Sequence, residues 1–397
     1  MVDWKQRKLG DHSQILTGGT PKTQIKEYWE PKEIPWMSSG EINKKRLFST
    51  DNQISKLGFE NSSARWIKEN SVLIALAGQG KTRGTVAINE ISLTSNQSIA
   101  AIEPDDTLDS GFLFQNLGKR YEELRLASSG DGSRGGLNKQ IISDIKIIAP
   151  SIKEQNTVGS FFKHLDDTIA LHQRKLNLLN RLKQTYMNAL FPQNDENIPV
   201  LRFVVFSEPW EQRALKEVSE RVRGNDGRMN LPTLTISAGS GWLDQRERFS
   251  GNIAGNEQKN YTLLSKGELS YNHGNSKLAK YGTVFALRTY NEALVPRVYH
   301  SFRTTDEASA DFVEFMFSTK RPDRELAKLV SSGARMDGLL NINYDDFSEI
   351  NIMIPKIDEQ NRISDFLRKF DETITLQQQK IDNMKTLKSI LLDKMFI

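Results

Sequence analysis

The segment Ala77–Thr82, AGQGKT, contains a Gly-Lys-Thr triplet of the kind that holds nucleotide phosphates. A phosphate-binding loop needs G-x-x-x-x-G-K-[ST] and opens a helix whose backbone amides face the phosphate. Here Ala75 stands where the first glycine should be, and the residues that follow, RGTVAI, favour a strand. We therefore predict a glycine-rich hairpin between two strands. Nucleotide hydrolysis at Gly78–Thr82 is the alternative, and nucleotide binding by the isolated chain would test it.

No other segment carries a complete catalytic motif. Pro322–Lys328, PDRELAK, resembles part of a nuclease site, but Glu325 and Lys328 are one residue too far apart. The chain has neither an Asn/Asp-Pro-Pro-Tyr/Phe loop for methylating a flipped base nor a Gly-x-Ser-x-Gly elbow. It has no cysteine, and its five histidines are scattered, so a zinc site is not expected. We predict a chain without catalytic activity and without a bound metal.

The remaining polar signals are cations and amides in glycine-rich loops. Arg, Lys, Asn and Gln are the side chains that clamp phosphates or hydrogen-bond to base edges. Any one of these clusters, taken alone, is also typical of a solvated loop. The candidate DNA-contacting residues are Lys44, Lys45, Arg46, Gln79, Lys81, Arg83, Arg134, Arg223, Arg228, Asn272, Asn275, Lys277 and Arg335.

The sequence contains one plan twice. Pro150–Phe191 aligns without a gap with Pro355–Phe396, and the two segments open with PSIKEQN and PKIDEQN. Further upstream, Trp4-Lys-Gln-Arg matches Trp210-Glu-Gln-Arg, and Gly84-Thr-Val matches Gly282-Thr-Val. The loop cations therefore form two sets at equivalent positions, which favours a shared binding role over chance.

Each repeated segment has the period of a long helix. Seam residues recur at steps of four and three over 165–190 and again over 370–395, which is the spacing of a coiled coil. The seam is interrupted by His172 and Lys183 in the first copy and by Gln377 and Lys388 in the second. Matching polar interruptions favour pairing of the two helices with each other. The alternative is that each apolar stripe packs on its own domain.

Between the helical segments, the sequence predicts two mixed α/β domains, so the fold class is α+β with an internal pseudo-two-fold repeat. The expected domains are 1–150 and, with a linker, 193–355, and the expected spacer helices are 151–192 and 356–397. The predicted strands are 71–77, 84–89, 98–103, 144–149, 282–288, 294–300 and 349–354, and the predicted short helices are 109–125 and 308–320.

The bulk composition is that of a soluble globular protein. With 54 Lys and Arg against 50 Asp and Glu, the net charge is +4, an excess that permits nucleic-acid binding without requiring it. The N-terminus has no apolar region of a signal peptide, and no apolar run is long enough to span a bilayer. We expect a cytoplasmic location.

Several phrases together identify a family. They are DWKQRKLG (3–10), IPWMSSGEI (34–42), LRF and PWEQRAL within 201–215, and the two P-x-I-x-E-Q-N phrases with helices ending in ALF and KMF. On these residues the chain resembles the specificity subunit of type I restriction–modification systems. The resemblance implies two target recognition domains, each reading one half of a split DNA sequence. It also implies two conserved helices that pair antiparallel as a coiled coil and hold the domains apart.

The same resemblance implies the partners. They are double-stranded DNA, two modification subunits that methylate adenine with S-adenosylmethionine, and two restriction subunits that translocate and cleave DNA with ATP and Mg. All three cofactors belong to the partner subunits, and none is expected on this chain. The subunit-docking residues would be Glu154, Gln155, Asn156, Glu359, Gln360 and Asn361. The alternative is a coiled-coil interaction scaffold that binds proteins and no DNA.

Overall fold

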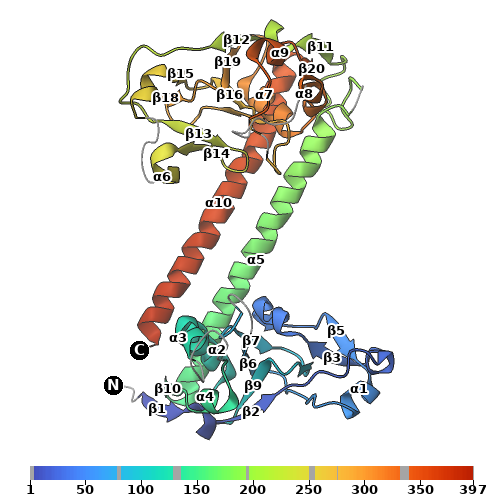
Figure 1. Ribbon diagram of the computed structural model, residues 1–397, viewed down its shortest axis with the longest axis vertical. Helices are drawn as coiled ribbons and strands as arrows, with labels where there is room; N and C mark the ends of the chain where they lie inside the picture. The colour runs from blue at the N-terminus through green and yellow to red at the C-terminus, as the bar shows by residue number, and fades with distance from the viewer. Residues whose placement is uncertain are drawn as a thin grey trace. The chain divides into compact units, whose positions relative to one another are not determined.

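The chain forms two compact units that share its two long helices. The computed structural model describes residues 4–77, 82–127, 136–193, 196–249, 255–274, 276–330 and 339–396 (Figure 1). Unit 1 comprises Met1–Arg174 and Gln378–Ile397, and unit 2 comprises Lys175–Gln377. The long helices are α5 (Ile152–Leu190) and α10 (Ile357–Met395). Each unit therefore holds one α/β domain and a part of each long helix, and the α+β fold class is confirmed.

The domain of unit 1 is built on a mixed five-stranded sheet in the order β2-β9-β6-β7-β4. Its central strand β6 (Val72–Ala75) is buried at every residue because both faces are covered. Val72 and Ile74 belong to the apolar cluster that includes α2 and α5, whereas Leu73 and Ala75 belong to a second cluster on the opposite face. Alternate residues of a strand point to opposite faces, so a sheet covered twice requires a continuous apolar run.

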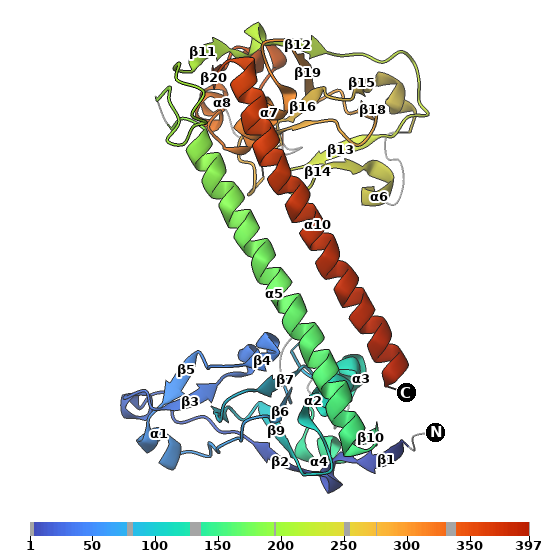
Figure 2. The same cartoon turned by 180° about the vertical axis from the view of Figure 1, so that it is seen from behind.

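Shorter elements complete unit 1. The antiparallel pair β1-β10 lies beside the start of α5 (Figure 2), and β5-β3-β8 forms a three-stranded sheet. The strands are β1 (Lys5–Lys8), β2 (Ser13–Thr17), β3 (Ile34–Met37), β4 (Arg46–Leu47), β5 (Asn52–Ile54), β7 (Val86–Asn89), β8 (Thr94–Ser95), β9 (Ile99–Pro104) and β10 (Lys146–Ala149). The helices are α1 (Lys56–Glu60), α2 (Ser110–Lys119), α3 (Tyr121–Leu126) and α4 (Lys139–Ser143).

The domain of unit 2 repeats this framework with a four-stranded sheet in the order β12-β19-β16-β17 and three two-stranded pairs, β11-β20, β13-β14 and β15-β18. Its strands are β11 (Glu211–Ala214), β12 (Ser219–Val222), β13 (Leu234–Ser237), β14 (Gly241–Asp244), β15 (Thr262–Ser265), β16 (Leu269–Asn272), β17 (Thr283–Ala286), β18 (Glu292–Val295), β19 (His300–Thr304) and β20 (Asn351–Ile354). Its short helices are α6 (Gln245–Phe249), α7 (Ala310–Ser318), α8 (Asp323–Leu329) and α9 (Tyr344–Ser348).

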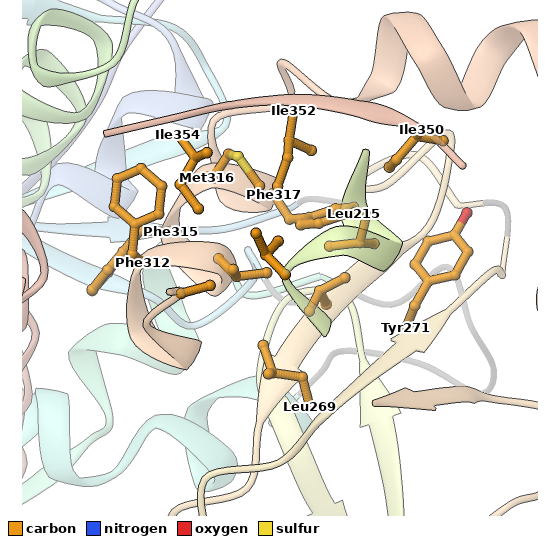
Figure 3. Close-up of a cluster of buried hydrophobic side chains, with 14 of the residues drawn as sticks. Leu215, Leu269, Tyr271, Phe312, Phe315, Met316, Phe317, Ile350, Ile352 and Ile354 are labelled. Atoms are coloured by element: carbon orange, nitrogen blue, oxygen red, sulfur yellow. The ribbon is translucent and has the colours of Figure 1, made fainter. Parts of the chain in front are cut away.

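The main core of unit 2 lies between α7, the sheet and the strand that leads into α10 (Figure 3). Phe312, Phe315 and Met316 of α7 pack there with Ile352 and Ile354 of β20. Each such side chain, when fully buried, contributes roughly 1.5–3 kcal/mol. The core therefore fixes the direction in which α10 leaves the domain.

The ends of the long helices are anchored in the same way in both units. In unit 1, Phe396 at the end of α10 lies 5.0 Å from Phe112 and 6.1 Å from Phe162, measured between ring centroids. In unit 2, Phe191 at the end of α5 lies 5.2 Å from Phe312 and 5.8 Å from Trp210. Each helix thus begins on its own domain and ends on the other one. The prediction that the helices pair is confirmed, and own-domain packing holds only for their first turns.

An ion pair joins the two helices in each unit. Lys388 Nζ lies 2.5 Å from an Asp166 carboxylate oxygen in unit 1, and Lys183 Nζ lies 2.5 Å from Asp371 in unit 2. Asp166 lies nearer the start of α5 and Lys388 nearer the end of α10. Lys183, in contrast, lies nearer the end of α5 and Asp371 nearer the start of α10, so the two helices run antiparallel. The polar interruptions predicted at Lys183 and Lys388 are therefore interhelical ion pairs that fix one register.

Most of the predicted short elements are correct in type, but some of their boundaries are wrong and one predicted strand is largely a turn. The strands 84–89, 98–103 and 144–149 correspond to β7, β9 and β10. The strand predicted at 294–300 is instead the end of β18 followed by a turn at 296–299, because Pro296 cannot donate to a strand ladder. The helix predicted at 109–125 is two helices, α2 and α3, that meet at Arg120.

Candidate nucleic-acid interface

One edge of the five-stranded sheet in unit 1 gathers the polar loops. β2 and β6 end at this edge while β7 and β9 begin there, as the register pairs Thr17↔Ala100, Ala75↔Ile99 and Ile74↔Val86 show. β3 ends there as well, since Asn96 N donates to Met37 O. We call residues 18–25, 38–45, 76–77, 82–85 and 96–98 the loop edge of unit 1.

Two tightly packed glycines shape this edge. A Cβ at Gly18 would lie 2.1 Å from the Ser95 carbonyl oxygen, and one at Gly19 would lie 2.2 Å from Ser63 Oγ, so no side chain fits at either position. The turn they form holds Thr20, whose hydroxyl donates to Gln97 Oε1 at 2.6 Å. Thr20 and Gln97 are polar groups that the sequence analysis missed. The double glycine in TGGTP (17–21) is the sequence signal from which this turn could have been predicted.

A buried carboxylate holds the next loop of the same edge. Glu41 is 4% exposed and accepts hydrogen bonds from Ser38 N at 2.9 Å and Asp51 N at 2.8 Å. Lys44 Nζ lies 3.0 Å from Glu41 and 2.7 Å from Asp51. The positive charge of Lys44 is therefore already balanced, and a phosphate would have to compete with two carboxylates for it.

Lys45 and Arg46 differ sharply although they are neighbours. Lys45 is exposed, and the pKa of its ammonium is lowered, first by desolvation and then by Lys388. A nearby phosphate would favour the charged form of Lys45. Arg46 is a correction, because its side chain is 12% exposed, pairs with Glu90 at 2.7 Å and lies over the ring of Phe114. Arg46 holds the domain together and is not available to DNA.

The glycine-rich segment lies between antiparallel strands, as predicted. β6 and β7 pair antiparallel on either side of it, and no helix follows Thr82, so the phosphate-loop geometry is absent from the described part of this segment. Gly84 leads into β7 with φ +79°, which favours glycine. Arg83 is half-buried beside it. The candidates Gln79, Lys81 and Arg134 lie outside the described residues and stay predictions.

Unit 2 presents an equivalent edge. β12 and β16 end there while β17 and β19 begin there, as the pairs Val222↔Ser301, Tyr271↔His300 and Asn272↔Thr283 show. Gly282 precedes β17 with φ +83° and matches Gly84 of unit 1. We call residues 223–228, 272–274, 276–282 and 296–299 the loop edge of unit 2.

The candidate residues of this second edge divide into exposed and engaged side chains. Arg223 and Lys277 are exposed. Arg228 is engaged, because its guanidinium donates to both oxygens of Glu292 and pairs with Asp226 at 2.7 Å. The hydrogen bonds with Glu292 and Asp226 raise the pKa of Arg228. Asn272 Oδ1 accepts from Gly274 N at 3.0 Å, so Asn272 shapes its own turn. The other two candidates, Asn275 and Arg335, lie outside the described residues.

Two stacked histidines support the loop edge of unit 2. The rings of His273 and His300 lie 4.9 Å apart, and His300 Nε2 lies 2.9 Å from the carbonyl oxygen of Ile342. Burial lowers the pKa of His300 to about 4, and the neighbouring His273 acts in the same direction. His300 is therefore neutral at pH 7 and donates to Ile342, which ties the chain at 340–342 to β19.

The residues predicted to dock partner subunits are partly buried instead. Gln155 is 0% exposed; its Oε1 accepts from Asp109 N at 3.0 Å and its Nε2 donates to Thr107 O and Pro150 O. Gln360 repeats this pattern with Ser309, Glu307 and Pro355. Both glutamines are corrections. They fasten the start of a long helix to its own domain and cannot contact another subunit.

The other docking candidates are mixed. Glu359 is 2% exposed and forms a bidentate pair with Arg202 at 2.8 and 2.7 Å, so it too is a correction. Its counterpart Glu154 is half-buried. Asn156 and Asn361 are exposed and stay predictions.

The outer faces of the long helices carry exposed leucines instead. Leu171 is 64% and Leu182 is 47% exposed on α5, and their counterparts Leu376 and Leu387 are 65% and 51% exposed on α10. All the seam residues over 165–190 and 370–395 are, in contrast, buried or half-buried. The exposed leucines occupy matching positions of the repeat, so an apolar partner surface would find the same contact twice.

Comparison with known sequences gives a consistent family. The model of the type I restriction modification DNA specificity domain matches residues 1–181 and 324–386. The chain is 26% identical over 196 residues to the type I restriction enzyme EcoR124I/EcoR124II specificity subunit of Escherichia coli, which covers 48% of each. It is 25% identical over 209 residues to the MjaIX specificity subunit of Methanocaldococcus jannaschii, covering 49% of this chain and 48% of the relative. The chain thus spans about half the length of these relatives.

Solved structures show the same fold. The S subunit of a type I restriction-modification system from M. genitalium matches with a TM-score of 0.63 at 12% identity, covering 100% of this chain and 96% of the other. A chain from a structure on complex assembly and conformational transition of the type I R-M system matches with a TM-score of 0.53 at 14% identity, covering 99% and 98%. Within the part of the chain that is described, no helix is both long and apolar enough to cross a membrane.

Proposed function

Because this chain belongs to the type I restriction modification DNA specificity domain family, we propose that it selects the DNA sequence on which a restriction–modification complex acts. Unit 1 contacts one half of a split target through its loop edge, and unit 2 contacts the other half through its own. The observation that carries this proposal is that both units have a loop edge formed by the ends of equivalent strands. In each loop edge a glycine with positive φ, Gly84 or Gly282, precedes the equivalent strand β7 or β17.

The chemistry of the two edges supports contact with nucleic acid. Lys45, Arg223 and Lys277 are exposed cations, which suit phosphates, while Thr20 and Gln97 offer the hydrogen-bonding groups that read base edges. The edges also differ in sequence wherever a turn does not require glycine. Different side chains on one repeated framework would give two unrelated half-sites.

The exposed leucines of the long helices supply the second part of the proposal. Leu171 and Leu182 on α5, with Leu376 and Leu387 on α10, dock two modification subunits. Restriction subunits join through that assembly. S-adenosylmethionine, ATP and Mg belong to those partners, and this chain contributes recognition without a cofactor of its own.

Binding to random duplex DNA at two salt concentrations tests the first part. Phosphate contacts release counterions, so affinity should fall by at least tenfold between about 50 and 200 mM salt for a few phosphate contacts. Arg223→Gln with Lys277→Gln should weaken binding and lower the salt dependence. Lys266→Gln, which removes an exposed lysine from a turn outside the loop edge, is the matched control. If the affinity changes neither with salt nor in the loop-edge variant, the alternative of a coiled-coil interaction scaffold that binds proteins and no DNA is favoured.

Mapping methylated adenines in cells that carry the full system tests the split target. We expect one bipartite motif, and the Arg223→Gln, Lys277→Gln variant should relax only one of its two parts. A continuous motif, or relaxation of both parts together, would contradict the assignment of one half-site to each unit.

Co-purification with the modification subunit tests the docking surface. Leu182→Glu with Leu387→Glu should abolish co-purification, because a charge on an apolar contact must be desolvated without a partner. Leu57→Glu, which alters a leucine 48% exposed on α1, should have no effect. Equal recovery of all three complexes would rule out these leucines.

A further inference from the structure

The linker that follows α5 packs on the first turns of α10 in unit 2. Arg202 of the linker forms a bidentate ion pair with Glu359, and the two side chains are 13% and 2% exposed. The next residue, Phe203, lies 6.1 Å from Phe366 of α10, measured between ring centroids. Unit 2 therefore uses an arginine and a phenylalanine of its own chain to cover an acid and an aromatic ring on α10.

In unit 1, the first turns of α5 carry the same acid and the same ring. Glu154 and Phe161 align with Glu359 and Phe366 in the ungapped repeat. The buried glutamine that follows each glutamate makes the same three hydrogen bonds to its own domain, so both helices start in the same orientation. Seven residues are about two helical turns, so the acid and the ring lie on one side of each helix. This side of α5 is the equivalent of the side of α10 that the linker covers.

The described residues of unit 1 do not cover this acid and this ring. Glu154 is half-buried but forms no ion pair in the described part of the chain, whereas Glu359 has Arg202. Phe161 is 46% exposed, and its one ring contact among the described residues is with the neighbouring Phe162, at 5.3 Å. A cation on Glu154 and an apolar group on Phe161 would therefore gain a charge-assisted hydrogen bond and buried apolar area.

The surface next to Glu154 is hollowed. A shallow depression of about 580 Å³ is lined by Ile152, Lys153, Asn156, Thr157 and Ser160 of α5. The counterpart of Ile152 in unit 2 is Ile357, which lines a cavity together with Val205 and Phe206 of the linker. The residues that follow the arginine and the phenylalanine therefore lie beside this isoleucine in unit 2. In unit 1 the hollow leaves room for such residues.

We propose that this face of α5 docks an extended segment of a partner protein in which an arginine precedes an aromatic residue. The arginine pairs with Glu154, the aromatic residue packs on Phe161, and the residues that follow lie in the hollow. The linker of a second copy is not the source, because its own Arg202 and Phe203 are engaged in unit 2. The chain fills the equivalent face of α10 itself, so this partner binds once per chain, whereas the exposed leucines occur on both helices.

A peptide of the linker tests the site, because its sequence already contains the arginine and the aromatic residue. The probe is residues 197–209, NIPVLRFVVFSEP, with a fluorescein label, and fluorescence anisotropy follows its binding to the full-length chain. We expect saturable binding of one peptide per chain. Arg202→Ala or Phe203→Ala in the peptide should weaken binding by about tenfold, as for the loss of one hydrogen-bonded charge or one buried aromatic side chain. If no peptide binds, or if the altered peptides bind as well, the proposal is wrong.

Variants of the chain locate the binding on α5. Glu154→Gln and Phe161→Ala should each weaken binding of the unaltered peptide by about tenfold. Glu60→Gln, at an exposed glutamate of α1, is the matched control. Glu154→Arg should reverse the preference, so that the chain binds the Arg202→Glu peptide better than the unaltered one. Equal affinity of all these chains for the unaltered peptide would overturn the assignment to α5.

Two further measurements separate this inference from its alternatives. Light scattering should give the unaltered chain and Glu154→Gln the same mass, and a dimer that this variant dissociates would make a second copy the occupant and contradict a partner protein. Binding of random duplex DNA should be the same for both chains, because the inference does not depend on DNA recognition. Loss of DNA binding in Glu154→Gln would assign this face to DNA instead.

Discussion

A single buried glutamine secures each long helix to its domain. Gln155 and Gln360 each make three hydrogen bonds to backbone groups of residues that lie outside the regular helices and strands. Gln155→Ala should lower the free energy of unfolding by about 2–4 kcal/mol, because it leaves buried donors and acceptors unsatisfied. Urea denaturation measures this. Asn156→Ala, at an exposed neighbour, should change it by less than about 0.5 kcal/mol.

His300 should make the chain sensitive to mild acid. Its pKa in the folded state is about 4, below the ordinary value of 6.5, so the unfolded state binds the proton more readily between these values. The contribution of His300 to the free energy of unfolding is therefore fully present above pH 6.5. It falls as the pH drops toward 4, by up to about 3 kcal/mol. Urea denaturation at a series of pH values measures the slope.

A variant isolates this histidine from the other titrating groups. His300→Gln keeps an N–H that can reach the Ile342 carbonyl but cannot take up a proton, so its stability should depend less on pH between 4 and 6.5. A slope identical to that of the unaltered chain would assign the acid sensitivity to other groups.

At this scale the sequence predicts residue types better than residue roles. Cations suit DNA and repeated acids suit docking, which favours Arg46 and Glu359 as site residues. In the structure, however, Arg46 lies in a largely buried ion pair with Glu90, and Glu359 is buried in an ion pair with Arg202. Nothing local distinguishes Arg46 from exposed Lys45, since the carboxylate that holds it, Glu90, is contributed by a distant part of the chain. Repetition marked Gln155 and Gln360 as important without showing that they face inward.

At the scale of elements, the ion pairs between the helices should stabilise both units. Lys183 and Asp371 are 22% and 34% exposed as side chains, so solvent screens their attraction and a double-mutant cycle should give a coupling of about 1 kcal/mol. The exchange Lys183→Asp with Asp371→Lys should recover most of the stability lost in either single variant. Single and double variants that lose stability additively would show that the pair does not set the register.

The long helices were the most predictable elements, and the strand ends were the least. A seam of several heptads is a strong periodic signal, and every seam residue is at least half-buried. Short strands offer few residues to average over, so the residue pattern predicts a strand through Pro296 where the structure has a turn.

At the scale of the molecule, the continuity of α5 and α10 makes them candidates for a ruler between half-sites. One heptad inserted after Arg174 and one after Gln377, where each helix passes from one unit to the other, keeps the seam in register and adds roughly 10 Å. The gap between half-sites should lengthen by about three base pairs at 3.4 Å each. Methylome mapping reads the gap directly, and an unchanged gap would show that the helices do not set it.

A two-residue insertion at the same places is the matched control. It rotates the seam by about 200°, so the helices should no longer pair and the complex should fail to assemble. If the two-residue variant assembled normally, the seam would not be what joins the halves.

The paired lysines and aspartates also make each half self-complementary. Residues 1–192 contain both Asp166 and Lys183. They also contain Phe191, the counterpart of the Phe396 that packs in unit 1. In two copies of residues 1–192, the α5 of each copy should therefore take the place of α10 in the other and join them as a homodimer. The dimer would have two identical recognition domains and should select a palindromic DNA sequence. Light scattering should show a dimer, Lys183→Asp should dissociate it, and adding Asp166→Lys should restore it. The present chain would then derive from one ancestral gene that was duplicated and fused. Its two recognition domains could diverge in DNA specificity while the long helices kept their pairing contacts.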